Sequence, residues 1–181
     1  MILRNYYAFL GRAIIGDDVI DPECLKVQSI TGDRMSSSGI LAQRYATATY
    51  LGLLSKKVSD NQIRLGVGIT QPTFEDSKLE NDITNSLVSS NVIVETVGDV
   101  GENCSATRRI KHQYINNSGE SITITEVGVG RSVVLNSSSY IFLISRDILA
   151  EPITVPNGQG ITVTVDLTFN GFEVFSSASA K

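Results

Sequence analysis

Short apolar runs separated by turn residues make up most of the chain after residue 46. The stretch 161–169 alternates strictly, with Ile161, Val163, Val165, Leu167 and Phe169 on one parity. A period of two is typical of a strand with one face in a core and the other in water. Runs of this character cover 46–54, 62–69, 91–98, 107–115, 120–129, 139–147, 152–155 and 160–169. The pattern therefore predicts a mainly β fold, an antiparallel β-sandwich of jelly-roll or Greek-key type with about eight strands.

The run 120–129 changes phase in its middle. Ile122 and Ile124 share a face, and Glu126 then stands where the next apolar residue belongs. Val127 and Val129 continue the pattern on the other parity. A β-bulge near Glu126 restores the alternation, and we favour it over a buried carboxylate.

The segment 140–144 is apolar on both faces. Such a strand is covered twice, either by a second layer of its own fold or by a partner subunit. We take it, with two apolar positions of the N-terminal segment, as the candidate subunit interface: Tyr140, Ile141, Phe142, Leu143, Ile144, Tyr6 and Leu10.

The segments before and after the predicted sandwich lack this strand pattern. Apolar residues recur every three or four positions in 1–15, which predicts a short amphipathic helix. That helix either packs on its own domain or forms an arm that docks on a neighbouring subunit. The polar run 31–39 reads as an exposed loop. We expect an N-terminal helix or arm and mobile loop over 1–45, a β-sandwich domain over 46–175 and a flexible tail over 176–181.

Two local signals add detail. The segment 72–87 has helical composition, with Thr73 placed as an N-cap three residues before Asp76. Near the C-terminus, Pro152 and Pro156 bracket a short segment before a reversal at 157–160. Arg146 and the adjacent Asp147 end the run 139–147. We expect them to form a local charge pair that fixes the corner at the end of that strand.

Composition narrows the function. The chain has 181 residues, 41% of them hydrophobic and 19% charged, as expected for one globular domain with a short appendage. Its net charge of −4 gives no positive field to attract nucleic acid. The basic cluster Arg108, Arg109, Lys111 and His112 is expected to be a solvated sheet face. The N-terminus lacks the uninterrupted apolar core of a signal peptide or membrane span.

Candidate chemistry is sparse. His112 is the only histidine, no nucleophile elbow surrounds a serine, and Cys24 and Cys104 form no zinc set with it. The motif GVGITQ at 66–71 lacks the third glycine of a dinucleotide fingerprint. The acidic pairs Asp17–Asp18, Glu75–Asp76 and Glu80–Asp82 are expected to be solvated surface. We therefore predict no catalytic residue, no cofactor and no metal.

Three stretches carry a resemblance that periodicity does not give. They read VGITQPTFEDSKLENDI, then ITITEVGV, then YIFLISRDILAEPITVPNGQGITVTVDLTF. Together they resemble the C-terminal half of virion structural proteins of tailed bacteriophages. The likeness covers roughly residues 63–170 and is densest at 140–169.

The resemblance implies a structural subunit of a tailed-phage virion that works by assembly and not by catalysis. It would be an accessory head-surface (capsid decoration), connector or tail component, made in the bacterial host cytoplasm. Its partners would be other virion proteins and copies of itself, with no nucleic acid or membrane involved. The alternative function is a receptor- or carbohydrate-binding module of a phage tail or fibre, using exposed loops such as 31–39 and 99–106.

Overall fold

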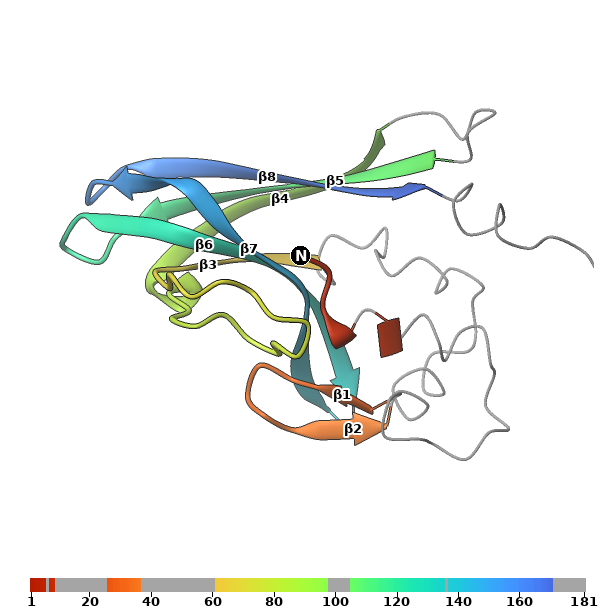
Figure 1. Ribbon diagram of the computed structural model, residues 1–181. Helices are drawn as coiled ribbons and strands as arrows, with labels where there is room; N and C mark the ends of the chain where they lie inside the picture. Colours follow the sequence, from red (N-terminus) through yellow and green to blue (C-terminus); the bar gives the residue numbers. More distant parts are fainter. Residues whose placement is uncertain (6, 9–25, 37–60, 98–104, 136, 171–181) are drawn as a thin grey trace, which may run out of the picture.

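The computed structural model describes residues 1–5, 7–8, 26–36, 61–97, 105–135 and 137–170. This part of the chain is mainly β, which confirms the predicted class, and its strands form three antiparallel sheets in a sandwich-like arrangement (Figure 1). The strands are β1 (Lys26–Gln28), β2 (Arg34–Ser36), β3 (Asn61–Gly66), β4 (Leu87–Val97), β5 (Ser105–Asn116), β6 (Ile122–Leu135), β7 (Ser138–Val155) and β8 (Gly160–Asn170). Among the described residues, no helix is long and apolar enough to cross a membrane.

Two three-stranded sheets form the body. One has the order β3-β6-β7 and the other β4-β5-β8, and β1-β2 is a separate hairpin. Figure 1 shows β4, β5 and β8 as a layer above β3, β6 and β7. The chain passes between the layers after β3, β5 and β7, so each sheet pairs strands that are distant in sequence.

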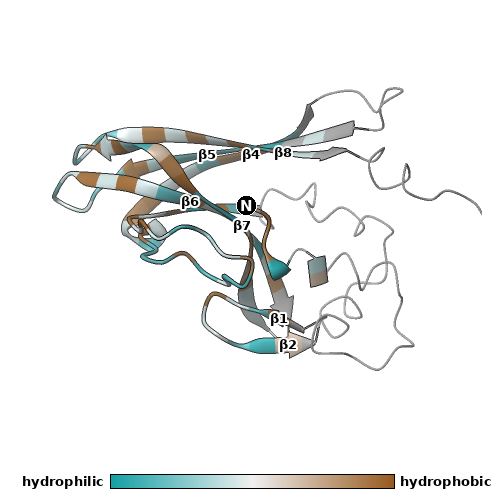
Figure 2. Ribbon diagram, viewed as in Figure 1, coloured by the Kyte–Doolittle hydropathy of each residue, from teal (hydrophilic) through white to brown (hydrophobic). Residues whose placement is uncertain are grey.

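The core between the two layers follows the alternation of the strands. Ile63, Ile110 and Phe142 are fully buried there. In β8, the apolar positions 161, 163, 165 and 167 are half-buried against this core, while the intervening threonines and Asp166 are exposed. Figure 2 shows the same banding of apolar and polar positions along the strands. The predicted faces of β8 are confirmed from Ile161 to Thr168.

The doubly apolar segment is covered on both faces by its own chain. Phe142 and Ile144 face the core between the sheets. Leu143 faces the other way and packs with Leu3 and Leu79. The interface prediction is therefore wrong for these three residues of β7, because the N-terminal segment and the segment after β3 supply the second layer. Tyr140 and Ile141 are partly exposed, and Tyr6 and Leu10 lie outside the described residues.

The N-terminus begins as an extended segment along β7, and not as the predicted helix. Ile2 bridges Ser145, and the Leu3 amide donates to the Ile144 carbonyl at 2.9 Å. Residues 4–5 and 7–8 are helical, and the remainder of the predicted helix, residue 6 and 9–15, lies outside the described residues. This extended start places Leu3 under Leu143, which a helix from residue 1 would not do.

The predicted loop 31–39 contains strand β2, which pairs with β1. The connection between them is closed by the Asp33 carboxylate, which accepts hydrogen bonds from Thr31 at 2.6 Å and Ser29 at 3.2 Å. These hydroxyl groups lower the pKa of Asp33. Val27 of β1 is fully buried in the main core, so this hairpin packs on the sandwich.

The segment 72–87 is not helical, apart from a 3₁₀ turn at Thr84–Ser86. Its backbone bonds to the outer edge of β3 instead: the Val67 amide donates to the Asn81 carbonyl, and the Ile83 amide donates to the Leu65 carbonyl. These groups are then unavailable for a helix. The expected contact between Thr73 and Asp76 still forms, because the Asp76 carboxylate accepts from the Thr73 amide and hydroxyl.

The runs 139–147 and 152–155 join into one long strand, β7. Pro152 is accommodated because β7 lies at the edge of its sheet, where a missing amide is tolerated. The reversal at 157–160 forms as expected, with Gly158 at a φ of 77°. The predicted strand 46–54 and the tail 176–181 lie outside the described residues.

Candidate functional site

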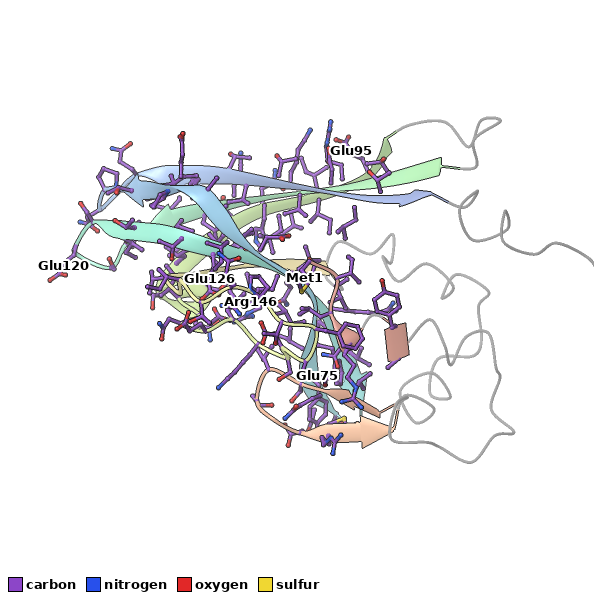
Figure 3. The ribbon with its side chains drawn as sticks, viewed as in Figure 1. Met1, Glu75, Glu95, Glu120, Glu126 and Arg146 are labelled. Carbon is purple, nitrogen blue, oxygen red and sulfur yellow. The ribbon has the colours of Figure 1, made fainter. Side chains whose placement is uncertain are left out.

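A buried ion cluster links β6, β7 and the segment after β3. Glu126 is fully buried, and the Arg146 guanidinium donates to it at 2.9 Å. The same guanidinium donates to Asp76 at 2.6 Å and to the Thr70 carbonyl at 3.0 Å. Figure 3 shows Glu126 and Arg146 side by side inside the molecule.

The chain itself satisfies this cluster. Glu126 also accepts backbone hydrogen bonds from Gly68 at 3.1 Å, Glu80 at 3.2 Å and Asn81 at 2.9 Å. Burial alone would raise the pKa of Asp76, but the hydrogen bonds from Thr73 and Arg146 outweigh it and hold that pKa below its usual value. The cluster therefore fastens the segment after β3 to the sheet, with Glu126 and Arg146 buried and Asp76 partly exposed.

Two predictions about these residues need correction. The pairing register does shift between Ile124 and Glu126, so the bulge is confirmed, yet Glu126 is a buried carboxylate as well. Arg146 and Asp147 do not pair with each other, because neighbours on a strand point to opposite faces. Asp147 is exposed and pairs with the amino group of Met1.

The acidic residues of this region are not simply solvated surface. Glu80 accepts from the Ile69 and Thr70 amides at 2.8 Å, and these hydrogen bonds lower its pKa. Asp82 pairs with the buried Arg64 at 2.5 Å. Glu75, Glu80 and Asp82 have the exposure that we expected of the acidic pairs, and Glu75 pairs with Arg4 at 2.8 Å. Asp76 is only partly exposed.

The glycines of GVGITQ make room for the buried carboxylate. A Cβ atom on Gly66 would lie 2.8 Å from the Asn81 carbonyl and would overlap Glu126. A Cβ atom on Gly68 would lie 2.6 Å from Glu126 Oε1. The motif is therefore part of the packing around Glu126.

A second polar group, Ser89–His112–Tyr114, lies between the sheets beside a cavity of about 420 Å³. His112 Nε2 is 2.6 Å from the Ser89 hydroxyl, and Nδ1 is 2.7 Å from the Tyr114 hydroxyl. Tyr114 donates its proton to the Ile63 carbonyl, so it must accept from Nδ1–H. His112 Nε2 therefore accepts from Ser89, which is the tautomer that a serine nucleophile requires.

This relay lacks what would make it catalytic. A base that takes a serine proton needs its imidazolium stabilised, usually by a carboxylate on Nδ1. Here a tyrosine hydroxyl occupies that place, and no carboxylate among the described residues pairs with His112. Burial lowers the pKa of His112 to about 4, so the charged form is opposed at neutral pH. We read the relay as a hydrogen-bonded link between the sheets.

The relay gives a prediction for acid stability. The folded pKa of His112, about 4, lies below the ordinary value of 6.5. The unfolded chain therefore binds the proton first, and stability should fall from pH 6.5 to 4 by about 3 kcal/mol from this group. Because His112 is the only histidine, its imidazole proton resonances can be followed by NMR without assignment. We expect a titration midpoint near pH 4, and a midpoint near 6.5 would contradict the buried relay.

The outer face of β4-β5-β8 is charged and paired. Arg109 donates twice to Asp166, at 2.8 and 2.6 Å, and Lys111 pairs with Glu95 at 3.0 Å (Figure 3 labels Glu95). The prediction of a solvated basic face is confirmed for Arg109 and Lys111. It is wrong for His112, which faces the core because its parity is that of Ile110 and Tyr114.

The two main sheets differ in whether other segments of the chain form hydrogen bonds with their edge strands. The outer edge of β3 is bonded to 81–83, and β7 is bonded to Leu3 and to Ile30. The outer edges of the other sheet have no such cover: within the described ranges, β4 and β8 each pair with β5 alone. Both strands are 11 residues long, but the register of β4 with β5 shifts between Ser89 and Asn91, whereas that of β8 is uninterrupted. A long, regular edge of this kind is a template for another strand, which makes it the candidate interaction site.

Among the residues that the structure describes, no group of three or more His, Cys, Asp or Glu side chains is placed to hold a metal ion. Cys24, Cys104 and the acidic pair Asp17–Asp18 lie outside them. Comparisons with protein-family models, with curated proteins and with solved structures found no match for this chain.

Proposed function

We propose that the chain is a structural subunit of a tailed-phage virion, an accessory component of the head surface, the connector or the tail that acts by assembly. The observation that carries the proposal is the edge of β8, a long regular strand that pairs with β5 alone among the described residues, whereas short segments of the same chain bond to the edges of β3 and β7. Natural proteins protect or pair long edge strands, because an open edge recruits other chains. An assembling subunit has a use for such an edge.

The buried polar groups are consistent with this function. Both polar clusters have their hydrogen bonds met within the chain, and neither presents a base and a nucleophile suited to chemistry. The resemblance noted in the sequence spans 63–170, the part of the chain that contains β3 to β8. We further propose a Greek-key type of sandwich, since the strand pairs β3-β6 and β5-β8 are each separated along the chain by an excursion into the other sheet.

The test is quantitative mass spectrometry of phage particles, purified by density gradient from a lysate of the bacterial host that carries this gene. We expect the chain to co-purify at a fixed copy number of at least several per particle, since virion subunits assemble with closed symmetry. Cryo-electron microscopy of the same particles would then place it. A chain that is abundant in the lysate and missing from the particles would overturn the proposal.

A further inference from the structure

We propose that the partner at the open edge of β8 is a second copy of this chain, paired antiparallel about a twofold axis at Val165. This rests on the proposed function, and it names the partner of the same edge. The two copies would join their β4-β5-β8 sheets into one continuous six-stranded sheet.

The phase of the hydrogen bonds identifies which groups are free. The Asn116 amide donates to the Gln159 carbonyl at 2.9 Å, next to the β5 to β8 ladder. Bonded and non-bonded pairs alternate in an antiparallel ladder. Residues 161, 163, 165 and 167 therefore direct their amides and carbonyls at β5. The groups of Thr162, Thr164, Asp166 and Thr168 point to the open edge.

A twofold axis at Val165 pairs these free groups with one another. Thr164 lies opposite Asp166 of the second copy, and Thr162 lies opposite Thr168. Each pair exchanges two backbone hydrogen bonds, and the Val165 pair between them is of the non-bonded type. An axis between two residues would put free groups opposite occupied ones. Because β8 runs from 160 to 170, Val165 is also its midpoint, so this axis uses the whole strand.

The side chains agree with the same axis. On the inner face, Val163 lies opposite Leu167, and these half-buried apolar groups would extend the core across the junction. On the outer face, each Asp166 meets a threonine and keeps its own Arg109. An axis at Asp166 would place two carboxylates directly opposite each other, which is destabilising in a cross-strand pair.

Disulfide trapping tests the register. In a chain with Cys24→Ser and Cys104→Ser, we expect Val165→Cys to form a covalent dimer on mild oxidation. Facing residues of a non-bonded antiparallel pair have Cα atoms about 4.5 Å apart, within disulfide range. The matched control is Val163→Cys, which shares the face and pairs with residue 167, so it should stay monomeric under the same conditions. Equal trapping of both variants, or of neither, would overturn the register.

A second pair of variants tests the edge without the cysteines. Thr164→Pro removes an amide that β5 does not use, so the fold should survive and dimerisation should weaken at least about tenfold. Thr164→Val keeps the amide and should dimerise like the parent in sedimentation velocity, with circular dichroism to confirm folding. If the parent is monomeric at high micromolar concentration, self-pairing is wrong. The proposed virion function would survive that result if the chain still appears in particles.

Discussion

Replacing Glu126 with alanine is expected to lower the free energy of unfolding by about 3–5 kcal/mol, the cost of removing one partner from a buried ion pair. The change leaves the Arg146 guanidinium without its most buried partner. It also removes the hydrogen-bond acceptor of three backbone amides, those of Gly68, Glu80 and Asn81. Urea unfolding followed by circular dichroism is the measurement, because the chain has no tryptophan to report by fluorescence.

The matched control is Glu120→Ala. Glu120 is an exposed glutamate in the connection before β6, far from the cluster in Figure 3. A surface substitution of this kind should change stability by no more than about 0.5 kcal/mol. Glu126→Gln, which keeps the shape and one acceptor oxygen, should lie between the two. If Glu126→Ala and Glu120→Ala unfold at the same urea concentration, the cluster does not hold the segment after β3.

The strands of the sandwich were predictable because alternation is a direct signature of a half-buried strand. The strict pattern of 161–169 gave both the position and the inward face of β8. In β5 the strand was predicted but its inward face was not, since Ile110 and Tyr114 face the core together with His112, which we had expected in solvent. Where the period was broken, the prediction was incomplete. A bulge and a buried carboxylate both disrupt alternation, and the phase change at Glu126 contains both.

The second layer over β7 was not predictable in detail, because its cover comes from segments that carry no periodic signal. Leu3, Ile30 and Leu79 belong to an N-terminal extension, a hairpin turn and an irregular segment, and they meet only in three dimensions on Leu143. The sequence did raise the right question about 140–144, since apolar residues on both faces require two layers. The pattern left both sources open, and our choice of a partner subunit was wrong at Leu143, where the chain itself supplies the second layer.

The open edge of β8 could not be inferred from the sequence either. Whether a strand is central or at an edge depends on which strands lie beside it, and the composition of β8 would suit both positions. One signal was available: Asp166 and three threonines occupy the polar face, while the chain's clearest apolar alternation lies opposite. That pattern identifies a half-buried strand, and only the sheet order places it outermost.

Adding one methyl group to the glycines of GVGITQ is expected to destabilise the protein by about 2–3 kcal/mol at each position, the cost of overpacking a closed site. The Cβ atom of Gly66→Ala would meet the Asn81 carbonyl at 2.8 Å and Glu126 Cγ at 2.6 Å. That of Gly68→Ala would meet Glu126 Oε1 and Glu80 Cβ, both at 2.6 Å. Neither carboxylate can retreat, because each holds backbone amides of this same segment.

The matched control is Gly160→Ala at the start of β8. Its Cβ atom would find nothing closer than the Tyr114 carbonyl at 3.5 Å, an ordinary contact. Gly160 has no positive φ to be strained by the change, so its stability should stay the same or rise slightly through reduced freedom of the unfolded chain. The urea midpoints of the three variants would show whether the glycines of GVGITQ serve loop flexibility or enclose the buried carboxylate. A loop glycine kept only for flexibility predicts three similar small effects, whereas a carboxylate enclosed by Gly66 and Gly68 predicts two large losses and one neutral change.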